Sequence, residues 1–260
     1  MFCSYGLNNI SAGTNTRWIN ADRFLLGLRR INLFVGGYGS GKSEVAINFA
    51  IGLKEWGFKV TVADLDIVNP YFRSREARKV LEGFGIEVLL PPVEIMESDL
   101  PIIQPEIVGA LKNPEKFLVL DLGGDPVGAR VLASISPWVP KDEIDSFFVL
   151  NSRRPWTRTV ESTKKMIEAI TDSCGFPITH LIVNSHLIEE TSVAVIEEGI
   201  KLAESVSKVA MIPIGFVAIE SRFFDITQFA NLPYPVLVME RYLLKPWEKD
   251  SRLGPARFKI

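Results

Sequence analysis

The sequence predicts a three-layer α/β fold: a doubly wound, mostly parallel sheet with helices on both faces. Short apolar runs suited to strands alternate along the chain with segments in which apolar residues recur at helical spacing. Most of the runs are apolar at consecutive positions, which is typical of parallel strands buried on both sides. A chain of 260 residues has the length of one large domain of this type.

The expected elements follow from these runs and from cap residues. We expect strands at residues 31–35, 60–63, 86–90, 117–120, 147–150, 181–183 and 209–212. One helix is expected from Ser43 to the stop at Gly57, because glycine commonly follows the last helical turn. Further helices are expected after Asn69-Pro70, over 160–170, and over 193–203 with Thr191 or Ser192 as its cap.

Domain boundaries are predicted from changes in composition. Residues 31–240 are expected to form a single domain. Residues 1–30 are expected to be an N-terminal extension, polar at first, with a short element near 18–28, and 241–260 a solvated tail. Residues 91–105 contain four prolines and several apolar side chains. That stretch fits a packed surface connection and an effector segment for a partner equally well.

Composition excludes several classes of function. Lys and Arg total 29 against 31 for Asp and Glu, a net charge of −2, so there is no strong signal for nucleic acid or an anionic membrane. No apolar stretch approaches the roughly 18 residues of a membrane span, and no signal peptide is evident. The two cysteines, Cys3 and Cys174, lie far apart without a metal-binding spacing. We therefore expect a cytoplasmic protein.

The most informative segment is residues 36–43, which read Gly-Gly-Tyr-Gly-Ser-Gly-Lys-Ser. This spacing satisfies the pattern of a phosphate-binding loop, the P-loop, in which backbone N–H groups surround anionic oxygens. The segment follows an apolar run and opens a helix, so the helix N-terminus would face the phosphates. We expect Lys42 to reach the β- and γ-phosphates and Ser43 to ligate Mg²⁺. The expected phosphate-binding residues are Gly36, Gly37, Tyr38, Gly39, Ser40, Gly41, Lys42 and Ser43.

Carboxylates follow two of the expected strands. Asp64-Leu65-Asp66 comes after the run 60–63, and Asp121 comes after 117–120. In doubly wound sheets ligands bind at the carboxyl ends of the strands, and Mg²⁺ prefers oxygen ligands. The sequence therefore predicts that these carboxylates lie near the phosphates.

The loop, the Asp-x-Asp pair and Asp121-Leu122-Gly123-Gly124-Asp125 together resemble the signal-recognition/Min/Par class of P-loop ATPases, over residues 31–240. This class includes the Min and Par partitioning ATPases and the nitrogenase iron protein. The resemblance implies that Lys42 and Asp66 are the catalytic residues. It implies that Asp66 orients the attacking water and belongs to the metal site. It also implies that Asp121 contacts Mg²⁺ through water and that Gly124 senses the γ-phosphate.

The same resemblance suggests how the base is bound. Asn184 follows the run 181–183, where the class often uses Asn, whose amide can both donate to and accept from adenine. The Asn-Lys-x-Asp pattern typical of guanine recognition is missing, because Ser185-His186 follows, so ATP is favoured over GTP. Pro213 lies in a segment similar to the one that packs beside the base in this class.

One position departs from the pattern. Min and Par relatives carry a second lysine just after the first glycine of the loop, and here that position is Gly37. A positive group at the leaving phosphate is worth a factor of about 10³ to 10⁵ in rate. The candidates to replace it are Arg73, Arg75, Arg153 and Arg154, each of which also suits an ordinary surface ion pair.

The sequence thus predicts an Mg·ATP-binding ATPase whose slow hydrolysis drives a conformational switch controlling an unidentified client protein, with a nucleotide-dependent homodimer as one option. Two alternatives stay open. One is an ATP-dependent small-molecule ligase or kinase of the same fold, similar to dethiobiotin synthetase, whose turnover depends on a metabolite. The other is a nucleotide-sensing interaction module without hydrolysis.

Overall fold

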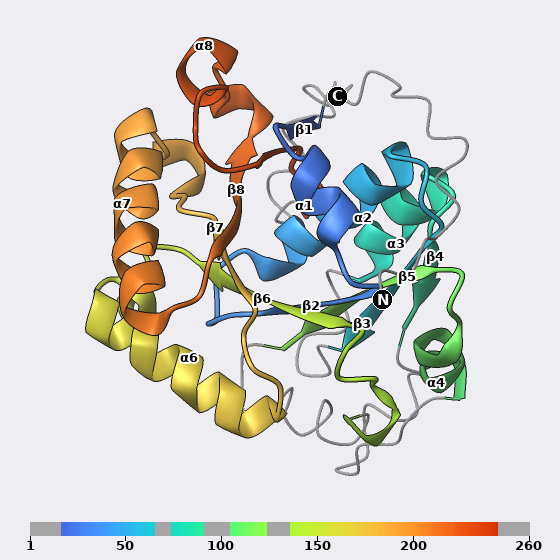
Figure 1. Cartoon of the computed structure of the whole chain (residues 1–260). Helices are drawn as coiled ribbons and strands as arrows, with labels where there is room; N and C mark the ends of the chain where they lie inside the picture. The colour runs from blue at the N-terminus through green and yellow to red at the C-terminus, as the bar shows by residue number, and fades with distance from the viewer. Residues whose placement is uncertain (1–16, 66–73, 91–104, 124–135, 244–260) are drawn as a thin grey trace, which may run out of the picture.

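The computed structural model describes residues 17–65, 74–90, 105–123 and 136–243, shown in colour in Figure 1. Across these residues nine strands form one sheet in the order β1-β9-β8-β7-β6-β2-β5-β3-β4. Every pairing is parallel except that of β1 with β9. The strands are β1 Trp18–Ile19, β2 Ile31–Val35, β3 Val60–Leu65, β4 Glu87–Leu89, β5 Phe117–Leu122, β6 Ile144–Leu150, β7 His180–Val183, β8 Ile214–Glu220 and β9 Val236–Met239. The predicted mostly parallel sheet is confirmed.

Helices cover both faces of the sheet, as predicted (Figure 1). The α-helices are α1 Asp22–Gly27, α2 Lys42–Glu55, α3 Ser74–Gly83, α4 Pro105–Lys112, α6 Val160–Cys174, α7 Val193–Ala210 and α8 Ile226–Phe229. Four short 3₁₀ turns are described: η2 Ser136–Trp138, η3 Pro155–Thr157, η4 Ile188–Glu190 and η5 Ser221–Phe223. Among the described residues no helix is long and apolar enough to cross a membrane.

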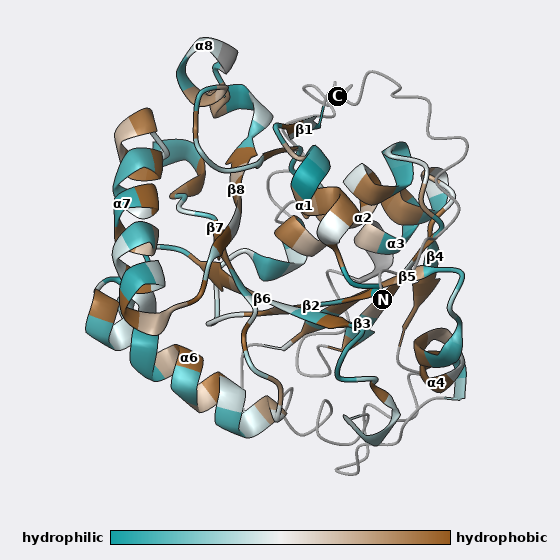
Figure 2. Ribbon diagram, viewed as in Figure 1, coloured by the Kyte–Doolittle hydropathy of each residue, from teal (hydrophilic) through white to brown (hydrophobic). Residues whose placement is uncertain are grey.

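The core has one layer on each face of the sheet. On the first face α2 packs on the central strand, and the rings of Phe34 and Phe49 lie 5.1 Å apart. On the second face α6 and α7 bury Ile167 and Ile200 against alternate strand residues. In Figure 2 the strands are largely brown, whereas α6 and α7 alternate between brown and teal, as expected for amphipathic helices. Because β2 is central and α2 is buried against it, the loop between them is held firmly.

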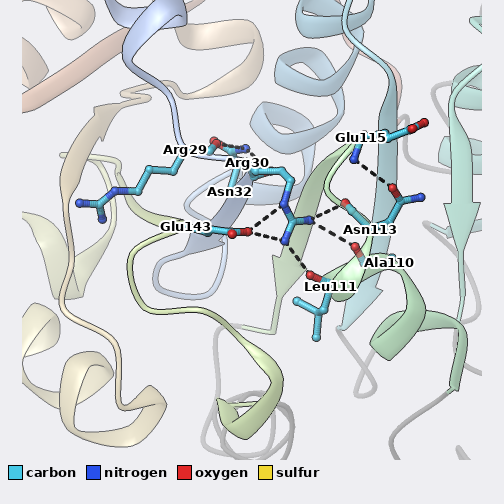
Figure 3. A network of polar contacts seen from close by, with 8 residues as sticks. All are labelled: Arg29, Arg30, Asn32, Ala110, Leu111, Asn113, Glu115 and Glu143. Atoms are coloured by element: carbon cyan, nitrogen blue, oxygen red, sulfur yellow. Dashed lines mark hydrogen bonds and ion pairs between the residues drawn. The ribbon is translucent and has the colours of Figure 1, made fainter. Parts of the chain in front are cut away.

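Arg30, which directly precedes β2, fixes the amino end of that strand (Figure 3). Its side chain is 6% exposed and donates to the carboxylate of Glu143 at 3.0 and 2.7 Å. It also donates to the carbonyl oxygens of Ala110, Leu111 and Asn113 at the carboxyl end of α4. A cation at this end of a helix satisfies carbonyls that the helix leaves unpaired. Arg30 therefore joins β2, α4 and the segment before β6.

Two expectations about boundaries need correction. Residues 17–30, expected to belong to an extension, are part of the domain, because β1 extends the sheet and Trp18 is buried. The run 209–212 is not a strand: α7 continues to Ala210, since its buried face at Ala203 and Val206 reaches that far, and β8 follows. The strands β8 and β9 were not predicted.

Candidate nucleotide site

The predicted P-loop lies at the carboxyl end of β2 and opens α2. Gly39, with φ 73°, and Gly41, with φ 87°, adopt left-handed backbone conformations that residues with a Cβ rarely take. Gly41 is the N-cap of α2, so the first N–H groups of the helix remain available to an anion. Lys42 is 7% exposed, and Ser43 is partly buried in the first turn. This is the arrangement of strand, glycine loop and helix that the sequence predicts.

The carboxylates of Asp64 and Asp121 lie next to each other at the same edge of the sheet. The two residues are partners in the register of β3 and β5, and Asp121 is also opposite Phe34 of β2. Strand alternation puts both on the face that carries α2, where Phe34 packs. Asp121 is 7% exposed. The structure therefore places Asp121 on the face of the sheet that carries α2, and Ser43 lies in the first turn of that helix.

Asn184, directly after β7, contacts the P-loop. Its backbone N–H donates to the carbonyl of Leu150, and its Nδ2 donates to the carbonyl oxygen of Ser40 at 2.8 Å. Asn184 is 2% exposed. A Cβ placed on Gly41 would lie 2.3 Å from its Nδ2, so a larger residue at 41 would displace it. Asn184, the predicted base-binding residue, thus stabilises the P-loop through its Nδ2. Its side-chain oxygen can accept a hydrogen bond from a ligand.

A cavity of about 340 Å³ extends from the P-loop past Asn184. Gly39, Gly41, Lys42 and Ser43 line one end, and Asn184 lies between the two ends. The other end is reached by the carboxyl end of β8 and by residues after β9, with an apolar wall formed by Ile188, Ile196, Phe223, Met239 and Leu243. Ligand pockets of about 300 to 1,000 Å³ are usual for small molecules. A polar end for phosphates and an apolar end for a ring are the two parts that a nucleotide requires.

Comparison with known proteins shows the fold. No family model matches the sequence, and no curated protein matches it. Among solved structures, the cell division protein FtsY from Thermotoga maritima is similar at TM-score 0.51 and 16% identity, over 73% of this chain and 61% of that one. The signal recognition particle 54 kDa protein from Aeropyrum pernix, in complex with GDP, gives TM-score 0.49 and 20% identity, over 73% of this chain and 41% of that one. The chain has the fold of a P-loop nucleoside triphosphatase.

The predicted P-loop fold is thus also the fold of a solved structure, the Thermotoga protein, to which this chain is distantly similar. A structure of FlhF complexed with GMPPNP and Mg²⁺ is a further match, at TM-score 0.43 and 19% identity, over 81% of this chain and 70% of that one. This chain spans about three-fifths of the length of the Thermotoga protein. The finer resemblance to Min and Par ATPases stays a prediction.

Arg154 lies against the P-loop. Its Nε donates to the carbonyl oxygen of Gly39 at 2.7 Å, and it lines the same cavity as Lys42. Its neighbour Arg153 instead pairs with Glu198. Of the four arginines suggested as replacements for the missing lysine, Arg154 is therefore the one that the described structure brings to the P-loop.

His186 lines the cavity beside Arg154. A Cβ on Gly41 would lie 3.0 Å from its Nε2. Burial lowers the pKa of His186 to about 4, and the positive charges of Arg154 and Arg241 act in the same direction. The imidazole is therefore neutral at pH 7, and the positive side chains that line the cavity are Lys42, Arg154 and Arg241.

The cavity's far wall is a segment that we call the strap, residues 239–243. Glu44, in the first turn of α2, accepts hydrogen bonds from the N–H groups of Tyr242 at 2.7 Å and Leu243 at 3.1 Å. Asn48, one turn later, accepts from the N–H of Glu240 and donates to its carbonyl, both at 2.9 Å. Burial raises the pKa of Glu44 to about 6. Residues 241–243, expected to belong to a solvated tail, are part of the pocket.

Pro213 is misplaced by the sequence-based prediction. It precedes β8, and its carbonyl accepts from the N–H of Leu181 in β7. The cavity lies at the opposite, carboxyl end of β8, near Glu220. Seven residues of strand separate the two ends, a distance of about 20 Å. The structure therefore does not bring Pro213 to this cavity, which Glu220 and Phe223 line at the carboxyl end of β8.

Several predicted residues lie outside the described residues: Asp66, Arg73, Gly124 and the side chain of Arg75. Within the described ranges, no group of three or more His, Cys, Asp or Glu residues could hold a metal ion. Mg²⁺ in phosphate sites usually keeps water and takes one or two protein oxygens together with phosphate oxygens. The hydroxyl of Ser43 and the carboxylate of Asp121 have the donor chemistry that such an ion requires.

Proposed function

We propose that this protein binds Mg·ATP and hydrolyses it, and that the cycle switches its conformation to control a partner protein. One observation carries the proposal: the P-loop is formed at the carboxyl end of β2, with Asn184 bonded to it and Asp121 at the same edge of the sheet. A cavity with a cationic end and an apolar end continues from the loop. These features support nucleoside triphosphate binding more directly than any other activity.

The chain's own residues supply positioning and charge. Backbone N–H groups of residues 36–43 and the side chain of Lys42 bind the β- and γ-phosphates. Ser43, and Asp121 through water, would hold Mg²⁺, which would neutralise phosphate charge. Asp66 orients the attacking water, and Gly124 senses the γ-phosphate. Because a loose phosphoryl-transfer transition state needs little covalent help, this arrangement is sufficient for slow hydrolysis.

The choice of ATP rests on the base-binding segment. Three residues after Asn184, where the guanine-reading pattern has a carboxylate, this chain has Leu187. The side-chain oxygen of Asn184 can accept a hydrogen bond from the exocyclic amine of adenine. The apolar side chains at the far end of the cavity suit either purine ring, so ATP and GTP must be compared directly.

The client protein and a nucleotide-dependent homodimer are part of the proposal. A switch acts by changing a surface when the γ-phosphate is lost, and the segments with Asp66 and Gly124 are the expected switch regions. Size-exclusion chromatography of the protein with ATP, with ADP and without nucleotide would detect such a dimer.

The central experiment measures binding and phosphate release for the wild type and for Asp66→Asn and Lys42→Ala, with ATP or GTP and Mg²⁺. We expect ATP turnover in the wild type, tight ATP binding without turnover in Asp66→Asn, and weak binding in Lys42→Ala. Unchanged hydrolysis by Asp66→Asn would overturn the role of that residue. Turnover with GTP alone would overturn the choice of base, and turnover only with an added metabolite would indicate a ligase or kinase.

A further inference from the structure

We propose that Arg154 contacts the terminal phosphates of the bound nucleotide and supplies, within the same chain, the positive charge that accelerates hydrolysis. This inference rests on the proposed function, because it names a further residue for that reaction.

The turn that carries Arg154 is rigid. It begins at Asn151, which is fully buried directly after β6, the strand next to β2. The carbonyl of Asn151 accepts from the N–H of Arg154 at 3.0 Å and from the Oγ1 of Thr157 at 2.6 Å. The N–H of Thr157 in turn donates to the carbonyl of Arg154. These bonds fix the backbone of Arg154 at the edge of the sheet where the P-loop lies.

The guanidinium of Arg154 lies against the P-loop. Its Nε donates to the carbonyl of Gly39, and a Cβ placed on Gly39 would be 3.2 Å from that nitrogen and 3.4 Å from Cζ. A residue with a Cβ at position 39 would therefore push the guanidinium away by a few tenths of an ångström. Because Nε is used for the loop, the two terminal nitrogens, with four N–H groups, are free to bind another acceptor.

No described acidic residue pairs with Arg154. The ion pairs of the described residues include Arg153 with Glu198, but none that involves Arg154. Within those residues the bond to Gly39 is also the only hydrogen bond of its side chain. Arg154 is half-buried and lines the cavity that Lys42 and Ser43 line.

Among the described residues neither Lys42 nor Arg154 has an ion pair, and two such positive groups at one end of a cavity favour an anion there. Charge attraction is stronger in a partly dry site than in water, so each cation there gains from a phosphate ligand. A guanidinium binds phosphate oxygens through two parallel N–H groups, which lysine cannot do. The chemistry of Arg154 therefore fits the phosphate chain of a nucleoside triphosphate.

The test compares Arg154→Ala and Arg154→Lys with Arg158→Ala, which removes an exposed arginine from the same part of the chain. Single-turnover and steady-state phosphate release are measured with saturating Mg·ATP, and affinities are measured for ADP and for a non-hydrolysable ATP analogue. Thermal unfolding verifies that each variant is folded. We expect kcat to fall by ~10²-fold or more in Arg154→Ala, with partial recovery in Arg154→Lys. We expect Arg158→Ala to match the wild type.

If Arg154 contacts the terminal phosphate, Arg154→Ala should lower the affinity for the ATP analogue more than the affinity for ADP. Equal losses for both nucleotides, with kcat unchanged at saturation, would mean that Arg154 only supports the loop, and would overturn the inference. So would turnover of Arg154→Ala equal to that of Arg158→Ala. If the wild type itself neither binds nor hydrolyses nucleoside triphosphates, the proposed function fails, and this inference with it.

Discussion

The side-chain amide of Asn184 donates a 2.8 Å hydrogen bond to the carbonyl oxygen of Ser40, 144 positions earlier in the chain. Both residues are 2% exposed. The bond joins the carboxyl end of β7 to the P-loop, so the part of the pocket beside the expected base and the part that binds phosphate are held together. A buried carbonyl that loses its only donor costs about 1–3 kcal/mol. The shape of the phosphate site therefore depends on a residue distant in sequence.

The first prediction concerns this bond. Asn184→Ala should leave the Ser40 carbonyl without its donor and loosen the loop. We expect ADP affinity to fall by about 5- to 150-fold, the equivalent of about 1–3 kcal/mol. Isothermal titration calorimetry with ADP and Mg²⁺ measures it. Asn113→Ala is the control, because among the described residues that side chain accepts only from the nearby N–H of Glu115. An Asn184→Ala protein that binds ADP as the wild type does would contradict the prediction.

A second prediction separates backbone strain from steric conflict in the loop. Gly41 and Gly57 both have left-handed backbones, with φ 87° and 97°. A Cβ on Gly41 would lie 2.3 Å from Nδ2 of Asn184, whereas a Cβ on Gly57 would have nothing within 4 Å. Gly57→Ala should therefore lose about 1–2 kcal/mol of stability from strain alone and keep nucleotide binding. Gly41→Ala should lose nucleotide binding as well.

Equilibrium unfolding in urea and ADP titration of both variants measure these two effects. The comparison is matched because the strain is similar in the two proteins and only the contact with Asn184 differs. Equal nucleotide affinity in Gly41→Ala and Gly57→Ala would show that the contact with Asn184 does not shape the site.

Local sequence patterns predicted the P-loop and Asp121 because each depends on neighbours in the chain. A glycine spacing between a strand and a helix is readable within about twenty residues, and a carboxylate after an apolar run marks a strand end. The contact of Asn184 with Ser40 could not be predicted in this way. It depends on β6 lying between β2 and β7 in the sheet, and the sequence does not contain that order explicitly.

The strap escaped prediction for a different reason. Residues 236–239 form an apolar run of only four, which periodicity cannot separate from a loop, so β9 and the segment after it were not recognised. Glu44 resembles a solvent-facing residue of a helix until Tyr242 and Leu243 cover it. Similarly, Val209–Ile212 has the composition of a strand, but packing of α7 continues the helix to Ala210.

The third prediction concerns the support of α2. The indole of Trp18 packs on Gly52, where a Cβ would lie 2.4 Å from its Nε1. Gly52→Ala should push Trp18 out of its buried position, and we expect a loss of about 1–3 kcal/mol from overpacking. Gly109→Ala in α4 is the control, since nothing lies within 4 Å of its Cβ, and alanine there should be neutral or stabilising by about 0.5–1 kcal/mol. Urea unfolding measures both, and a Gly52→Ala protein as stable as Gly109→Ala would rule out this packing.

The last prediction is a pH dependence that arises from His186. Its pKa is lowered to about 4 in the folded protein, chiefly by burial, from an ordinary value of 6.5. Between these values the unfolded chain binds a proton that the folded protein does not. The contribution of His186 to stability therefore falls as the pH decreases from 6.5 to 4, and is constant above 6.5. His186→Gln removes this dependence.

The measurement is the difference in unfolding free energy between the wild type and His186→Gln across this pH range. Glu44, whose pKa is raised, has the opposite slope, but it is present in both proteins and cancels in the difference. We expect the wild type to lose up to about 3 kcal/mol relative to the variant as the pH falls from 6.5 to 4. Parallel curves for the two proteins would mean that the imidazole accepts a proton in the folded state as easily as in the unfolded chain, which its burial and the positive charges of Arg154 and Arg241 argue against.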